Sequence, residues 1–186
     1  MRILGVSGSL RESSFNTSLL RAAAEAAPDG VELELWDGIA ELPLYDEDLD
    51  NDDPPESVHR LREAWGAADA ILFATPEYNG SVPGGLKNAV DWGSRPRLEA
   101  PLRNKPVAVV GASTGQFGAL WAQQDLKKIL GAAGARVVGT EIPVSRAHEK
   151  FDQSGRLLDG EVFEQLRLHL TTLASEAVAA SERVAA

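Results

Sequence analysis

The chain has 186 residues, of which 44% are hydrophobic and 25% are charged, and its formal net charge is −10. This length and composition indicate one globular domain spanning residues 1–186. The negative charge argues against nucleic acid or an anionic membrane surface as a partner. The chain contains no cysteine, which excludes disulfides, thiolate metal sites and a cysteine nucleophile.

The expected compartment is the cytoplasm. A sequence without cysteine is consistent with a reducing environment. A strand pattern starts at Arg2, which leaves no room for the apolar region of a signal peptide, and no apolar stretch reaches the length of a membrane span. We therefore expect a cytoplasmic protein that does not enter a membrane.

Strand and helix patterns alternate along the chain. Apolar or alternating runs predict five strands, at 2–7, 31–36, 69–75, 105–113 and 135–143. Helical spacing predicts helices at 14–27, 56–67, 83–93, 117–132 and from 160 to the C-terminus. Residues 37–55 form a long acidic loop, and loops that are longer than a connection requires are often functional.

Five strands with intervening helices predict an α/β fold in which a parallel sheet is covered on both faces. Right-handed crossovers leave two common doubly wound arrangements. Five strands favour a flavodoxin-like three-layer sandwich with strand order 2-1-3-4-5 over the six-stranded dinucleotide-binding arrangement. Ligands of such sheets bind at the carboxyl ends of the strands, where the strand order reverses. The loops after the first, third and fourth strands are therefore the candidate site.

The loop after the first strand, residues 8–16, reads Gly-Ser-Leu-Arg-Glu-Ser-Ser-Phe-Asn. Its hydroxyl, guanidinium and amide donors precede a helix, where free backbone N–H groups attract anions. The loop lacks the Gly-x-Gly-x-x-Gly fingerprint and the Walker A lysine, so a terminal monophosphate suits it better than a pyrophosphate or a triphosphate. A second interpretation stays open: Ser13 or Ser14 caps the helix and Arg11 is solvated.

The loop after the third strand, within residues 75–88, is dense in uncommon residues. Tyr78 offers a ring for packing, Asn79 and Ser81 offer hydrogen bonds, and the glycines allow close backbone approach. As the alternative, Asn79 and Gly80 form an ordinary turn and Tyr78 covers the core.

The loop after the fourth strand, residues 111–119, is rich in small residues. Such residues leave backbone N–H groups free to meet the polar edge of a heterocycle. One loop that suits phosphate and two loops that suit a planar polar ring together indicate a mononucleotide such as FMN.

The segments 8–16, 76–92 and 111–118 resemble those of the NADPH-dependent FMN reductase family, flavodoxin-like proteins that include quinone, chromate and azo-dye reductases. The resemblance spans roughly the whole chain. It implies that phosphate is held by Ser9, Arg11, Ser14 and Asn16. It further implies that the flavin ring is lined by Pro76, Glu77, Tyr78, Asn79 and Ser81, and its pyrimidine edge by Ser113, Thr114 and Gly115.

The resemblance also implies a homodimer or homotetramer, formed through the helix at 83–93. The segment 42–46 resembles one that borders the pocket in the family, although a solvated acidic loop is an equal alternative. Trp121 stands where many relatives carry an arginine, which leaves the choice between NADPH and NADH open.

The expected activity is transfer of hydride from NADPH or NADH, through bound FMN, to a small acceptor such as a quinone, azo compound, chromate or free flavin. The flavin carries this chemistry, so no catalytic side chain is expected. A non-catalytic flavodoxin-type electron carrier and a fold that has lost its flavin are the alternatives.

No metal site is predicted. The three histidines, His59, His148 and His169, lack metal-ligand spacing, and we expect them at the surface or at helix ends. The acidic run 46–53 lacks the glycine and the terminal glutamate of an EF-hand, so a solvated charge run is expected.

Overall fold

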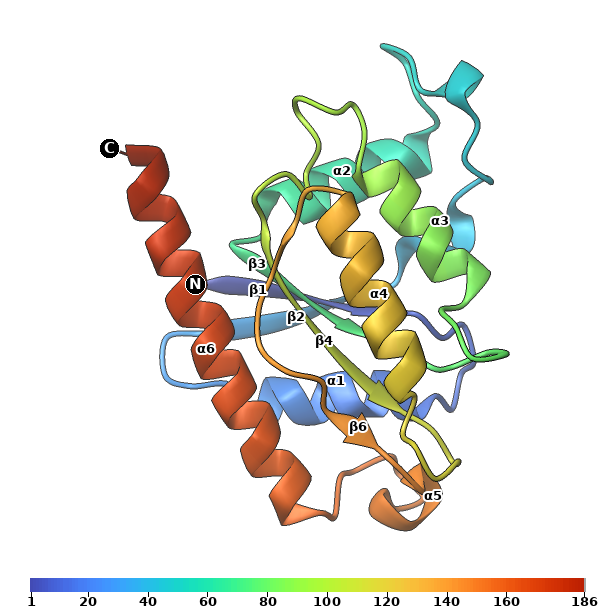
Figure 1. Cartoon of the computed structure of the whole chain (residues 1–186), viewed down its shortest axis with the longest axis vertical. Coiled ribbons are helices and arrows are strands. Elements are labelled where there is room, and N and C mark those ends of the chain that lie inside the picture. The colour runs from blue at the N-terminus through green and yellow to red at the C-terminus, as the bar shows by residue number, and fades with distance from the viewer. Residues whose placement is uncertain (186) are drawn as a thin grey trace.

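Six strands form one parallel sheet in the computed structural model, which describes residues 1–185 (Figure 1). The strand order is β2-β1-β3-β4-β5, and β6 also pairs with β4. The bounds are β1 (Arg2–Ser7), β2 (Glu32–Trp36), β3 (Ala70–Ala74), β4 (Pro106–Ala112), β5 (Arg136–Val137) and β6 (Pro143–Val144). This order confirms the predicted flavodoxin-like α/β sandwich.

Helices cover both faces of the sheet, as Figure 1 shows. One face packs on α1 (Phe15–Glu25) and α6 (Gly160–Ala185), and the other on α2 (Glu56–Ala67), α3 (Gly84–Gly93) and α4 (Leu120–Ala132). Short elements complete the chain: the 3₁₀ turns η1 (Gly38–Glu41) and η2 (Glu47–Leu49) and the helix α5 (Ala147–Lys150). None of the helices within residues 1–185 combines the length and apolar character needed to cross a bilayer.

The core lies in two layers because successive side chains of a strand point to opposite faces of the sheet. In β3, Leu72 packs towards α1 and α6, whereas Ile71 and Phe73 pack towards α2 and α3. Every residue of β3 and β4 is buried. The continuous apolar runs of these two strands therefore mark the centre of the sheet, as predicted.

The predicted fifth strand, 135–143, is interrupted. Its two ends pair with β4, at Val107–Val137 and at Gly111–Pro143. Three residues of β4, 108–110, separate these pairings, whereas five residues, 138–142, separate them on the edge strand. The excess residues loop out, and the single predicted strand becomes β5 and β6.

Helix starts depend on local backbone geometry. The helix α1 starts at Phe15 because Ser14 is its N-cap, and α4 starts at Leu120 because Gly118 and Ala119 adopt positive φ, 57° and 60°. The bounds of α2 are those predicted, and α5 was not predicted. The last residue of the predicted C-terminal helix, 186, lies outside the described residues.

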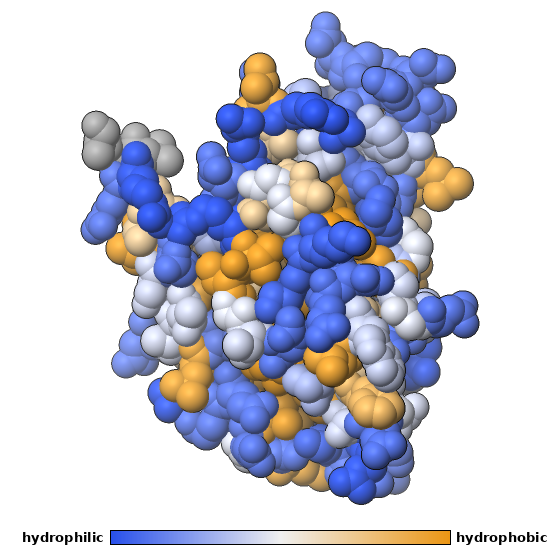
Figure 2. Space-filling model, viewed as in Figure 1, coloured by the Kyte–Doolittle hydropathy of each residue, from blue (hydrophilic) through white to orange (hydrophobic). Residues whose placement is uncertain are grey.

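The surface is mainly hydrophilic on the side shown in Figure 2, where apolar atoms are exposed in separate patches. Several large apolar side chains are exposed, among them Leu10, Leu44, Leu98, Phe117 and Trp121. Two of these, Leu10 and Phe117, belong to the loops that follow β1 and β4. Apolar surface is thus available at the carboxyl edge of the sheet.

Candidate functional site

The loops after β1, β3 and β4 meet at the carboxyl edge of the sheet and enclose a cavity of about 170 Å³. Phe15 and Ala112 contribute to its wall. Nine of the predicted site residues line it: Ser9, Arg11, Ser14, Asn16, Pro76, Glu77, Tyr78, Ser113 and Thr114. Asn79, Ser81 and Gly115 belong to the same loops but do not line this cavity. The structure thus brings together segments about 100 residues apart along the chain.

Ser14 ends the first loop as the N-cap of α1. Its Oγ accepts hydrogen bonds from the backbone N–H groups of Asn16, at 3.2 Å, and Thr17, at 3.4 Å. The capping interpretation is therefore correct for Ser14. Capping uses the acceptor side of the hydroxyl, so its hydrogen stays available to a ligand at this positive end of the helix.

Arg11 lies exposed over the first loop and donates from Nη2 to the carbonyl oxygen of Ser13 at 2.7 Å. It forms no ion pair with a carboxylate among residues 1–185. Arg11 is the cation in the lining of the cavity, and Glu77, in the second loop, is the carboxylate. The side of the cavity formed by the first loop is therefore its positive side. An anion would meet Arg11 there together with the N-terminus of α1.

Asn16 ties the first loop to the third. It is only 3% exposed; its Nδ2 donates to the carbonyl oxygen of Ala112 at 3.0 Å, and its Oδ1 accepts from the N–H of Ala112 at 2.9 Å. This pair of bonds holds the start of α1 against the end of β4. One Nδ2 hydrogen remains for a ligand, so Asn16 combines a structural link with one free donor.

The second loop carries a two-residue turn at Asn79 and Gly80, whose φ values are 53° and 77°. Tyr78 and Ser81 close it with reciprocal backbone bonds of 3.0 and 3.2 Å. Positive φ at both central residues is the Asn-Gly hairpin turn, so the turn interpretation is correct for this pair. Tyr78 is 50% exposed at the cavity, so the alternative that it covers the core is wrong.

Glu77 and Ser81 connect this hairpin to α4. Glu77 Oε2 accepts from the N–H of Ala122 at 3.2 Å, in the first turn of the helix. The residue before that helix, Ala119, has no capping side chain, so Glu77 satisfies a helix N–H that would otherwise lack a partner. Ser81 donates to Asp125 Oδ2 at 2.8 Å, which explains why its hydroxyl faces α4 and not the cavity.

The third loop is hydrogen-bonded to β6 and to the segment that follows it. Ser113 donates its N–H to the carbonyl oxygen of Val144, and its own carbonyl accepts from Ala147, each at 3.0 Å. Gly115 accepts from the N–H of Arg146 at 3.0 Å and donates its N–H to Ser113 Oγ at 3.0 Å. These bonds hold Ser113 and Thr114 in the cavity wall.

Gly8 is subject to a packing constraint that the loop's residue types do not reveal. A Cβ on Gly8 would lie 2.7 Å from Leu86 Cδ2, and its N–H donates to the carbonyl oxygen of Ala74 at 2.8 Å. The absence of a side chain thus lets the first loop approach α3 and the end of β3. A glycine directly after a buried strand was the available signal.

The segment 42–46 is held against α3 by hydrogen bonds. Asn88 donates to the carbonyl oxygen of Pro43 at 2.8 Å and accepts from the N–H of Tyr45 at 2.7 Å, and Trp92 Nε1 also donates to Pro43 at 2.9 Å. The segment does not line the cavity of its own chain. Its role at a pocket therefore stays a prediction.

His169 contradicts the expectation that the histidines lie at the surface. It is 7% exposed in α6, and its ring packs directly against Gly139. Burial lowers the pKa of His169 to about 4, with Lys127 adding to the decrease and Glu141 opposing it. His59 and His148 are exposed, as predicted.

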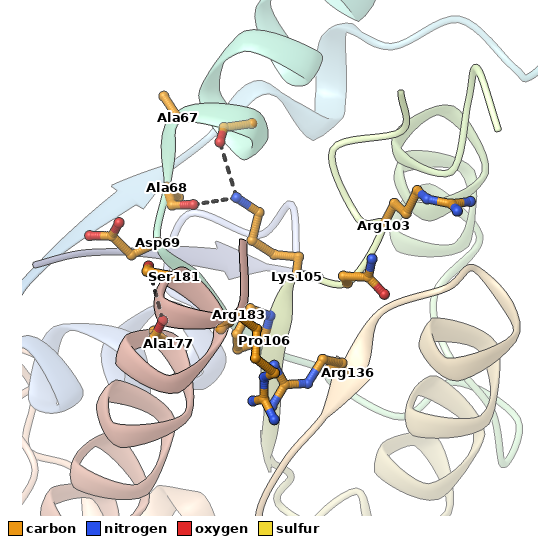
Figure 3. Close-up of a pocket in the computed structure, with 13 residues that line it drawn as sticks. Ala67, Ala68, Asp69, Arg103, Lys105, Pro106, Arg136, Ala177, Ser181 and Arg183 are labelled. Atoms are coloured by element: carbon orange, nitrogen blue, oxygen red, sulfur yellow. Dashed lines mark hydrogen bonds between the residues drawn. The ribbon is translucent and has the colours of Figure 1, made fainter. Parts of the chain in front are cut away.

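A second cavity, with a volume of about 770 Å³, lies at the opposite, amino end of the sheet (Figure 3). Three of its cations already have protein partners: Lys105 donates to the carbonyl oxygens of Gly66 and Ala68, and Arg136 and Arg183 both pair with Glu176. Arg103 points away from Lys105 in Figure 3. The carboxyl-edge cavity is thus the better candidate site.

Comparison with known proteins shows the family of the chain. Residues 1–149 match the family described as NADPH-dependent FMN reductase. An NAD(P)H-dependent FMN reductase from Pseudomonas aeruginosa is 45% identical over 174 residues, which cover 93% of this chain and 93% of that protein. A quinone reductase from Escherichia coli is 37% identical over 174 residues, 92% of each.

A solved structure shows the same fold. The flavoenzyme NAD(P)H:(acceptor) oxidoreductase FerB from Paracoccus denitrificans superposes with a TM-score of 0.85 and 34% identity, covering 96% of this chain and 97% of that one. The chain belongs to the NADPH-dependent FMN reductase family and is an FMN-dependent NAD(P)H oxidoreductase with a flavodoxin-like fold.

Proposed function

We propose that the chain passes hydride from NADPH or NADH, through FMN bound at the carboxyl-edge cavity, to a small acceptor of the quinone class. The observation that carries the proposal is the convergence of the three loops on one cavity with a cationic, donor-rich side and an aromatic side. The similar proteins named above include an FMN reductase and a quinone reductase. Bound FMN supplies the hydride and electron transfer.

The first loop is the proposed phosphate site. The donors are the side chains of Ser9, Arg11, Ser14 and Asn16, together with the N-terminus of α1. A monophosphate presents several oxygens, and this set offers hydroxyl, amide and guanidinium hydrogens to them. The donor set therefore fits the phosphate of FMN.

The second and third loops are the proposed ring site. Pro76, Glu77 and Tyr78 line the cavity, whereas Asn79 and Ser81 form and anchor the hairpin that carries them. Ser113, Thr114 and Gly115 are proposed to meet the pyrimidine edge. The cavity is smaller than the ~300–1,000 Å³ typical of ligand pockets. A bound mononucleotide would therefore extend beyond the cavity onto the open surface, where donor and acceptor can reach it.

Trp121 bears on the choice of nicotinamide cofactor. It is 46% exposed and stacks at a tilt on Phe117, with ring centroids 4.8 Å apart. An indole offers no charge-assisted bond to a 2′-phosphate, whereas an arginine at this position would offer one. We therefore propose that the chain uses NADH as well as NADPH.

The proposed assembly is a homodimer or homotetramer, and the proposed compartment is the cytoplasm, where reduced nicotinamide cofactors are made and used. The apolar side chains of α3, Leu86, Ala89, Val90 and Trp92, are buried within the protomer and give no support to assembly through that helix. The support for assembly comes instead from exposed apolar side chains at the carboxyl edge, such as Leu10 and Phe117. Sedimentation of the purified protein tests the assembly.

The activity test separates an enzyme from an electron carrier. Purified protein saturated with FMN is mixed with NADH or NADPH and a benzoquinone, and loss of the nicotinamide absorbance is followed. Rapid oxidation that requires both FMN and quinone is expected. A protein that retains no FMN, or one that binds FMN yet oxidises neither nicotinamide, contradicts the proposal; the second result favours the carrier.

A further inference from the structure

Gln123 is a buried glutamine of α4 that has no place in the proposed flavin contacts. It is 0% exposed. Its Oε1 accepts from the N–H of Ile142 at 3.0 Å, and its Nε2 donates to the carbonyl oxygen of Gly118 at 3.1 Å. One side chain thus joins the backbone of the segment that precedes β6 to the backbone at the end of the third loop.

The first of these segments is the end of the interruption between β5 and β6. Ile142 is the last residue before β6, and the loop-out at 138–142 leaves its N–H without a partner on β4. Gln123 provides that partner from the helix. A Cβ on Gly111 would lie 2.9 Å from Gln123 Nε2, so the amide lies directly against β4. Gln123 therefore occupies the space that the interrupted strand opens.

The second segment is the turn from the third loop into α4. Gly118 and Ala119 both have positive φ, a conformation that is costly for alanine. A Cβ on Gly118 would lie 2.5 Å from the carbonyl carbon of Pro143, so the turn packs tightly on β6. The bond from Gln123 holds the carbonyl of Gly118 in this turn.

Both attachments lead to the third loop. Val144 lies two residues after Ile142 and accepts the N–H of Ser113, and Gly118 lies three residues after Gly115. The segment 113–118 is thus held at one end by β6, which lies beside the carboxyl end of β4 (Figure 1), and at the other end by α4. Gln123 forms hydrogen bonds at both places, to Ile142 before β6 and to Gly118 before α4.

We infer that Gln123 is a positioning residue for FMN: it couples the interrupted edge strand to the third loop, so that Ser113, Thr114 and Gly115 are held in place for the pyrimidine edge of the flavin. The inference rests on the proposed role of these three residues in FMN binding. A glutamine is needed because one atom must accept and the other must donate. Glutamate lacks the donor, and methionine lacks both at similar volume.

The test compares Gln123→Met and Gln123→Glu with Leu130→Ala. Leu130 is a buried residue near the other end of α4, so its truncation destabilises the helix packing without touching the third loop. For each apoprotein we would measure thermal unfolding and the Kd for FMN from quenching of flavin fluorescence. For each holoprotein we would record the visible absorption spectrum of bound FMN.

Both Gln123 variants are expected to raise the Kd for FMN by about tenfold or more, and to shift the bound-flavin spectrum towards that of free FMN. Leu130→Ala is expected to lower the unfolding temperature while Kd and spectrum stay those of the wild type. If Gln123→Met does not fold, Gln123→Glu decides, because it keeps the volume and the bond to Ile142.

Two negative results are distinguishable. A wild-type protein that does not bind FMN overturns the proposed function itself. In the second case, the wild-type protein binds FMN and Arg11→Ala weakens that binding, but the Gln123 variants keep the wild-type Kd and spectrum. This result overturns the role of Gln123 alone. If Leu130→Ala raises the Kd for FMN as much as the Gln123 variants do at an equal loss of stability, the role of Gln123 is overturned as well.

Discussion

The side chain of Asn16 and the backbone of Ala112, 96 residues apart in sequence, are joined by two hydrogen bonds of 3.0 and 2.9 Å. The two bonds satisfy both backbone groups of Ala112 at the end of β4. They also set the spacing between the proposed phosphate loop and the proposed ring loop. One amide therefore connects the two ends of the candidate site.

Replacing Asn16 by alanine is expected to destabilise the apoprotein by about 2–4 kcal/mol, because two buried backbone groups of Ala112 lose their partners. Urea unfolding measures this loss. Asn16→Asp, which keeps the acceptor and loses the donor, should fall between alanine and the wild type. An alanine variant as stable as the wild type would show that the two bonds contribute nothing net.

Replacing Arg11 by alanine is expected to weaken FMN binding by about 10- to 100-fold, the value of a charge-assisted hydrogen bond to phosphate. Stability of the apoprotein should stay unchanged, because the side chain is exposed. Fluorescence titration with FMN measures the effect, and Arg21→Ala on the exposed side of α1 is the matched control. Equal affinities of the Arg11 variant and the wild type would remove Arg11 from the site.

Replacing Trp121 by arginine is expected to raise the preference for NADPH over NADH, because a guanidinium can pair with the 2′-phosphate. The ratio of kcat/KM for the two cofactors measures the preference, and FMN affinity should not change. Phe117→Ala is the control for loss of the aromatic contact without a new charge. A cofactor ratio identical to that of the wild type would place Trp121 outside the nicotinamide site.

The buried His169 predicts a loss of stability in acid. Burial lowers its pKa to about 4 from the ordinary value of 6.5. Between these values the unfolded chain binds a proton that the folded chain does not, so stability is complete above pH 6.5 and declines as the pH falls towards 4. The full loss from this group is roughly 3 kcal/mol.

Urea unfolding at a series of pH values tests this dependence. His169→Leu should flatten the curve between pH 6.5 and 4, whereas His148→Ala, at an exposed histidine, should leave it unchanged. Parallel curves for His169→Leu and the wild type would show that His169 is protonated equally in the folded and unfolded chains.

Most of the fold was predictable because local patterns and the global arrangement agree. The apolar runs at 69–75 and 105–113 identify the two central strands, since only strands buried on both faces are apolar throughout. The strand order then places the three unusual loops at one edge. That much of the candidate site follows from residue type and order along the chain.

Residue roles within the loops were less predictable. Ser14 suits both a helix cap and a ligand contact, and Asn79 suits both a turn and a ligand contact, since these roles use the same residue types. Only their backbone partners show that the cap and the turn are present. The bond from Glu77 to the start of α4 is likewise invisible in sequence, because it joins residues 45 positions apart.

The opening segment of the site illustrates this division. The order of amino acids was enough to predict that residues 8–16 lie between a strand and a helix and are rich in donors, because hydrophobic periodicity and side-chain chemistry are local properties. Tertiary structure alone decided the interruption of the fifth strand, the burial of His169 and the bridging positions of Asn16 and Gln123. These depend on which backbone groups lack a partner after the sheet and helices pack, and that is a property of the assembled fold.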